Sequence, residues 1–92
     1  MEVSIVAHVK RWTVDIYIDE HEDARRTRAE ARLHTGDDTQ LLGVGTAWRN
    51  PHDAEVPEIG DEVAASRALA DLAEKLRQAV ATDIEAVAEE AL

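Results

Sequence analysis

The spacing of apolar residues changes once along this chain, and that change limits the folds open to it. Between Trp12 and Trp48 apolar residues recur largely at every second position, whereas after Pro57 they recur at three- and four-residue intervals. Period two is typical of strands with one buried face, and the longer interval is typical of an amphipathic helix. Pro51, between the two regions, cannot continue a β-ladder. The sequence therefore predicts an α+β domain in which strands precede one helix.

Three strands are predicted in the first region, joined as an antiparallel meander in the order 1-2-3. They run from Trp12 to Asp19, from Thr27 to Thr35 and from about Gln40 to Trp48. An eight-residue connection after the first strand sets Ile18 opposite Thr27. We expect the tryptophans to anchor the core, because the alternation places both on the buried face.

The turn between the second and third strands fixes which residues of the third strand are buried. With Asp37 and Asp38 at its tip, the buried pairs are Leu33 with Leu42, Ala31 with Val44, and Thr27 with Trp48. This register leaves a small-residue strip, Leu41, Gly43, Gly45 and Ala47, on the outer face. Gly43-Val-Gly45 lies inside a strand, so it indicates close packing and not a phosphate loop.

A long C-terminal helix is predicted to begin around Pro57 and to pack on one face of the sheet. A helix reaching Leu92 would measure about 45–50 Å, well beyond a strand of roughly 20–30 Å. Thr82–Glu85 has capping-box spacing, so either the helix breaks there or its last turns overhang and meet another subunit. We favour the overhang or a kink with partner contacts, because Ile84, Val87 and Leu92 otherwise lack a surface to bury. The predicted apolar stripe is Val63, Leu69, Leu72, Leu76, Ala79 and Val80.

Residues 11–92 are predicted to form a single domain, preceded by residues 1–10 as an N-terminal arm or an extra strand. Val3, Ile5, Ala7 and Val9 alternate, but out of phase with the first strand. The segment does not have the pattern of a signal peptide, and no apolar stretch approaches the roughly 20 residues that span a bilayer. We therefore expect a cytoplasmic protein that does not bind membranes.

The composition favours self-association. The chain has no Phe, one Tyr, two Trp and sixteen Ala, so the core of a monomer would be thin. Burial between subunits would compensate for the small side chains. We expect the oligomer contacts on the outer strip and the helix end, at Leu41, Ala47, Ile84, Val87 and Leu92.

Five segments carry a family resemblance: Trp12–Asp19, Thr27–Leu33, Gly43–Gly45, Arg49–Pro51 and Val56–Glu62. Together they resemble a family of small actinobacterial proteins of unknown function, whose fold resembles the double-stranded-RNA-binding domain. The likeness covers about Arg11 to Ala81 and leaves out Met1–Lys10. It implies the same strand-strand-strand-helix order, and it implies no activity. The first helix of the RNA-binding fold is expected to be missing, because the ten residues before the first strand are too few to form it.

Charge argues against double-stranded RNA as a ligand. The formal net charge is −10, and the acids are spread along the chain. The loop at 19–23 reads Asp-Glu-His-Glu-Asp, and the helix starts with Glu58, Asp61 and Glu62, where phosphate binding requires bases. One basic cluster is predicted at one end of the sheet, formed by Arg25, Arg26, Arg28 and Arg49. It could hold an anionic ligand, nucleic acid or a partner's carboxylates, or it could neutralise the neighbouring acidic loop, which we favour.

No residue pattern predicts catalysis, a metal site or a cofactor. His21 and His52 stand beside acids but lack the spacing of metal ligands, and a solvated acidic loop explains them better. Ser4 and Ser66 have no nearby histidine, and cysteine is absent. The sequence therefore predicts a non-enzymatic, self-associating interaction or regulatory protein. The alternative is weak binding of nucleic acid or an anionic ligand at the arginine cluster.

Overall fold

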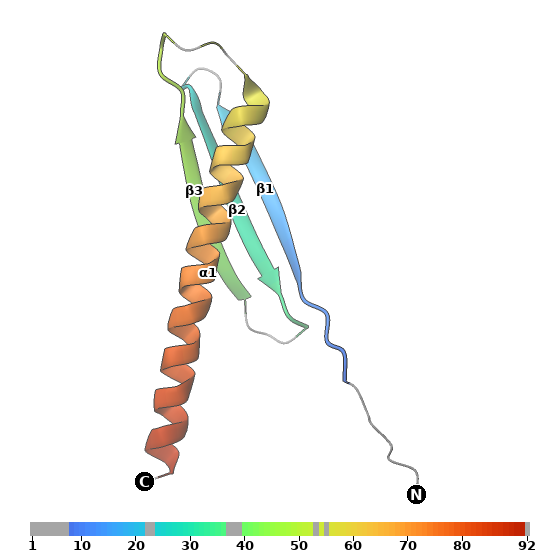
Figure 1. Ribbon diagram of the computed structural model, residues 1–92, viewed down its shortest axis with the longest axis vertical. Helices are drawn as coiled ribbons and strands as arrows, with labels where there is room; N and C mark the ends of the chain where they lie inside the picture. The colour runs from blue at the N-terminus through green and yellow to red at the C-terminus, as the bar shows by residue number, and fades with distance from the viewer. Residues whose placement is uncertain (1–7, 22–23, 37–39, 53, 55, 92) are drawn as a thin grey trace, which may run out of the picture.

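The computed structural model confirms the predicted order of three strands and one helix. β1 (Thr13–His21), β2 (Arg26–His34) and β3 (Gln40–Trp48) form an antiparallel sheet in the order β1-β2-β3. α1 (Pro57–Glu90) lies along one face of this sheet (Figure 1). The structure describes residues 8–21, 24–36, 40–52, 54 and 56–91.

The predicted register between β2 and β3 is wrong by one residue. Leu33 pairs with Leu41, where Leu42 was expected, and Ala31 pairs with Gly43, where Val44 was expected. A shift of one residue turns every side chain of a strand to the opposite face. The strip predicted to be outside, Leu41, Gly43, Gly45 and Ala47, therefore faces α1, and the residues predicted to be buried, Leu42, Val44 and Trp48, face outward.

The register between β1 and β2 is wrong by two residues, which leaves the faces unchanged. Ile18 pairs with Ala29 and Ile16 with Ala31, so the apolar residues of β1 share the helix side of the sheet. The predicted assignment of sides in β1 is confirmed. The connection between β1 and β2 includes Arg25, which adopts a left-handed φ of 51°, a conformation that costs a non-glycine residue about 1–2 kcal/mol.

The helix approaches β3 through glycine and alanine. A Cβ atom at Gly43 would collide with the backbone of Ala68 and Leu72, and one at Gly45 would collide with the backbone of Ala64 and Ala68. We call Gly43, Gly45, Ala64 and Ala68 the Gly–Ala seam. The core of described buried residues is accordingly small: Ala29, Ala31, Leu33, Ala47, Ala64, Ala68 and Leu72.

A row of helix side chains closes the free edge of β3. The Arg67 guanidinium donates to the Thr46 carbonyl at 2.6 Å, and the Lys75 ammonium donates to the Leu42 carbonyl at 2.8 Å. Between them, the Val44 backbone N–H donates to the Asp71 carboxylate at 2.8 Å. Because these helix residues are spaced four apart, they lie on one side of α1. The row satisfies backbone groups that would otherwise be open to another strand.

This row predicts an acid-sensitive contribution to stability. The Val44 N–H first, and the Lys75 ammonium second, hold the pKa of the Asp71 carboxyl below its ordinary value of 3.8. Because the pKa of Asp71 is lower in the folded chain than in the unfolded chain, its carboxylate stabilises the fold at pH values above the ordinary pKa. This stabilisation is lost as the pH falls through the pKa of the folded state. We expect Asp71→Asn to lower the urea midpoint at pH 7, and we expect its difference from the parent to shrink as the pH falls below 3.8. A difference that persists unchanged in acid would contradict this role.

α1 continues without a break through Thr82, so the predicted alternative of a break is wrong and the overhang itself is confirmed. That its last turns meet another subunit stays a prediction. Its 34 residues extend about 50 Å, whereas a nine-residue strand extends about 30 Å. Figure 1 shows the C-terminal half of α1 running beyond the sheet. Every described residue from Val80 onward is exposed. Of the predicted N-terminal arm, residues 1–7 lie outside the described residues, and residues 8–10 belong to no strand.

Candidate functional site

The most prominent surface feature is an apolar strip on β1 that α1 leaves uncovered. Val14, Ile16 and Ile18 point to the helix side of the sheet, yet they are 39%, 41% and 40% exposed. Trp12, directly before β1, is 53% exposed, so the prediction that it anchors the core is wrong. The physical reason is the position of the helix. The Gly–Ala seam draws α1 onto β3, at the opposite edge of the sheet from β1.

One side of α1 extends this strip. At 100° per residue, Leu69, Leu76 and Val80 lie opposite the side that carries Asp71. Because Asp71 contacts the β3 edge, the opposite side of the helix faces toward β1. Leu69 and Val80, predicted to belong to the buried stripe, are 41% and 52% exposed. We define the α1/β1 face as Trp12, Val14, Ile16, Ile18, Leu69, Leu76, Val80, Ile84 and Val87.

The other face of the sheet carries paired charged groups beside the outward-facing Leu42, Val44 and Trp48 of β3. Glu30 binds Arg28 at 2.5 Å and Arg32 at 2.8 Å, and these hydrogen bonds lower the pKa of its carboxyl. The Arg32 guanidinium also lies 4.2 Å from the centre of the Tyr17 ring. These charged groups therefore already have partners within the chain.

The predicted oligomer contacts have three different outcomes. The prediction is wrong for Leu41 and Ala47, because both face α1. Ala47 belongs to the core, and Leu41 packs against the core. Ile84 and Val87 are exposed on the overhang, at 64% and 66%. Leu92 lies outside the described residues. The exposed apolar residues of β1 were assigned to the core, because alternation shows which side a strand buries but not how far the helix reaches.

The predicted arginine cluster is located where the strands end and α1 begins. The Arg49 backbone N–H donates to the Arg25 carbonyl at 2.8 Å, which joins the segment after β3 to the turn before β2. Arg25, Arg26 and Arg49 line one pocket of about 460 Å³. Arg28, predicted to join them, is absent from its lining and binds Glu30 on the outer face. We call this cavity the arginine pocket.

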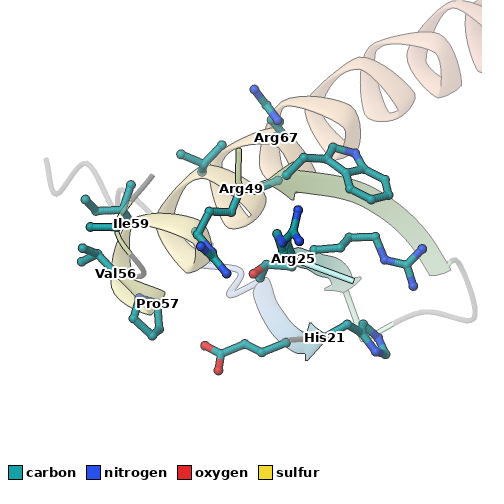
Figure 2. A pocket seen from close by; sticks show the side chains of 15 residues that line it. His21, Arg25, Arg49, Val56, Pro57, Ile59 and Arg67 are labelled. Carbon is teal, nitrogen blue, oxygen red and sulfur yellow. The ribbon is translucent and has the colours of Figure 1, made fainter. Parts of the chain in front are cut away.

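The described lining of the pocket combines cationic and apolar groups. Figure 2 shows Val56, Pro57 and Ile59 on one side and His21 on the other, with Arg25 and Arg49 between them. Glu20 is the one carboxylate among the described lining residues. Arg67 contributes to the wall, and sequence analysis missed it because α1 brings it from a distant part of the chain.

Arg26 and Trp48 complete the wall of the pocket. The Arg26 guanidinium carbon lies 5.6 Å from the centre of the Trp48 ring. The Nε atom of Arg26 is a buried donor with no hydrogen-bond partner among the described residues. Trp48 is 67% exposed, so the prediction that it anchors the core is wrong. Its side chain is instead available at the pocket rim.

Histidines and acids do not gather into a metal-binding group anywhere in the described part of the chain. Several acids of the predicted acidic loops, Glu22, Asp23 and Asp53, lie outside that part. No helix among the described residues is long and apolar enough to cross a membrane.

Comparisons with known proteins find relatives of the chain among uncharacterised mycobacterial proteins. The family described as Rv2632c-like matches residues 10–92. Uncharacterized protein Mb1767 of Mycobacterium bovis is 52% identical over 79 residues, which cover 86% of this chain and 81% of that protein. Uncharacterized protein Rv2632c of Mycobacterium tuberculosis is 47% identical over 77 residues, 84% of this chain and 80% of that protein.

A solved structure has the same fold. The crystal structure of Rv2632c superposes with a TM-score of 0.77 at 46% sequence identity, and the match covers 89% of this chain and 95% of that one. The predicted resemblance to an actinobacterial family of unknown function is therefore confirmed. The further likeness to the double-stranded-RNA-binding domain stays a prediction.

Proposed function

Since the chain belongs to the Rv2632c-like family, whose relatives named above carry no assigned activity, we propose a function from its own surface: a non-enzymatic interaction protein that acts as a homodimer. The observation that carries this proposal is the exposure of Val14, Ile16 and Ile18 on the helix side of the sheet. A second copy would cover the α1/β1 face and supply the burial that the small core lacks.

The area of the face supports a second copy. The exposed fractions of its exposed residues range from 39% for Val14 to 66% for Val87. With the side-chain areas typical of these residue types, the exposed part amounts to roughly 700 Å², close to the ~800 Å² per partner of a standard interface. Exposed apolar patches of this size on soluble proteins mark interaction sites.

Charge affects how two copies of the chain can associate through the α1/β1 face. Each chain has a formal net charge of −10, so two copies repel one another at long range. The α1/β1 face consists of uncharged residues. Two copies can therefore pack these side chains against each other without bringing like charges together among them. Salt screens the remaining repulsion, and we expect the dimer to tighten as ionic strength rises.

The test is sedimentation of Ile16→Lys against a matched control, Leu42→Lys. Ile16 and Leu42 are 41% and 39% exposed on opposite faces of the sheet. We expect the parent and Leu42→Lys to sediment with twice the chain mass of 10.2 kDa at micromolar concentration. Ile16→Lys would bury a charge at the interface and weaken the dimer about 100-fold or more.

A parent protein that sediments as a monomer at high micromolar concentration would refute the dimer. Equal weakening by both lysine substitutions, or weakening by Leu42→Lys alone, would refute the assigned face. Circular dichroism and thermal unfolding of both variants provide the folding control.

A further inference from the structure

We propose that the arginine pocket binds a small organic anion that carries an apolar body, with the anionic group held by Arg25 and Arg49. This site is separate from the α1/β1 face, and the proposal does not depend on the dimer. It rests on a cavity lined by Arg25, Arg26 and Arg49 beside an apolar wall, in a chain whose formal net charge is −10.

The positive side of the pocket comes from two parts of the backbone held together. The hydrogen bond from the Arg49 N–H to the Arg25 carbonyl, at 2.8 Å, fixes the two segments side by side. Arg25 occupies this place at the cost of a left-handed φ of 51°. Strained non-glycine residues cluster at functional sites, because the side chain is needed where the backbone disfavours it.

Arg26 adds a donor that has no acceptor within the described chain. Its Nε is buried and unpartnered, although Trp48 lies near its guanidinium. A buried donor left unpaired costs free energy. Guanidinium groups present forked donors that match carboxylate and phosphate oxygens.

The apolar wall determines which anions fit best. Val56, Pro57, Ile59 and Val63 line the pocket beside the arginines. The volume of about 460 Å³ lies within the range of small-molecule sites, which combine apolar walls with a few polar groups. An inorganic anion would leave this wall bare, so the ligand chemistry is a carboxylate or a phosphate monoester with a hydrocarbon body.

The experiment is a titration with octanoate, octyl phosphate, octanol and inorganic phosphate. The fluorescence of Trp48 reports on the pocket, because Trp48 lines it. The chain has two tryptophans, so all variants carry Trp12→Phe, which leaves Trp48 as the single tryptophan. We expect saturable changes in Trp48 emission with octanoate or octyl phosphate, and affinities at least tenfold weaker for octanol and for inorganic phosphate. The tighter of the two octyl anions identifies the anionic group as a carboxylate or a phosphate.

Variants distinguish the pocket from the rest of the surface. Arg25→Gln and Arg49→Gln are each expected to weaken binding by about tenfold or more, because each removes a charged donor. Arg28→Gln is the matched control and is expected to change binding less than twofold, since Arg28 binds Glu30 on the outer face. Ile16→Lys is expected to leave binding unchanged, which separates this site from the α1/β1 face.

Arg25→Gly checks folding and function together. Glycine relieves the left-handed φ, so we expect the thermal midpoint to stay the same or rise while binding falls as in Arg25→Gln. Binding that survives in the Arg25 and Arg49 variants would overturn the proposal. So would octanol binding as tightly as the octyl anions, or no binding by either octyl anion.

Discussion

Replacing Gly45 with alanine is expected to lower the free energy of unfolding by about 3 kcal/mol, at the upper end of overpacking costs. The added Cβ would collide with the backbone of Ala64 and Ala68 on α1. A side chain can rotate away from such a collision, but a helix backbone has to lift off the strand. Small domains are stable by only about 5–15 kcal/mol, so this loss is a large share of the total.

Gly60→Ala is the matched control in a urea titration. Its Cβ would lie 3.1 Å from the Thr27 Oγ1, a side-chain atom that can move, and alanine favours the helix. We expect the unfolding free energy of Gly60→Ala to stay within about 1 kcal/mol of the parent. If Gly45→Ala were as stable as Gly60→Ala, α1 would not approach β3 as closely as the seam requires.

The seam links the core to the surface. Because glycine in β3 admits the helix backbone, α1 settles over β3 and β2 and leaves the apolar side of β1 to solvent (Figure 1). The same placement brings Asp71 and its neighbours along the helix to the β3 edge. One edge of the sheet is thus closed by side chains, and the apolar face beside the other edge is available to a partner.

The order and type of the elements could be predicted from the sequence, because period two and helical spacing differ strongly. The face of β3 could not, because it depends on the turn. A turn with its tip at Asp37 and Asp38, as predicted, would pair Leu33 with Leu42. In the structure His34 pairs with Gln40, which shifts the register by one residue and pairs Leu33 with Leu41. The predicted register put Leu42 and Val44 on the buried face, although the close approach of the helix requires the glycines there.

The candidate sites were predictable in part. The topology alone brings Arg25, Arg26 and Arg49 to one end of the sheet, and the structure places all three in one pocket. Arg28 could not be excluded without knowing that its guanidinium reaches Glu30. Arg67 could not be included, since its place depends on the path of α1 across the sheet.

The spacing Arg67, Asp71, Lys75 was visible in the sequence as a row along one side of the helix. Its role as a cover for the β3 edge was not, because a row of alternating charges is usually solvated. The role becomes clear only in the structure, where all three side chains form hydrogen bonds with the backbone of β3.

The rate of thiol labelling at Ile16 is expected to depend strongly on protein concentration. The chain has no cysteine, so Ile16→Cys and Leu42→Cys each introduce a single thiol at a similarly exposed strand position. Above the dissociation constant of the dimer, a second copy would cover Ile16 and leave Leu42 open. Labelling of Ile16→Cys by a maleimide would then be at least about tenfold slower than that of Leu42→Cys, because the reagent reacts only with the dissociated fraction.

This labelling experiment tests the central claim most directly, because it asks whether the apolar side of β1 is covered in solution. The account predicts slow labelling of Ile16→Cys at high concentration and equal rates for the two variants on dilution. Equal rates at every concentration, in a folded protein, would contradict it.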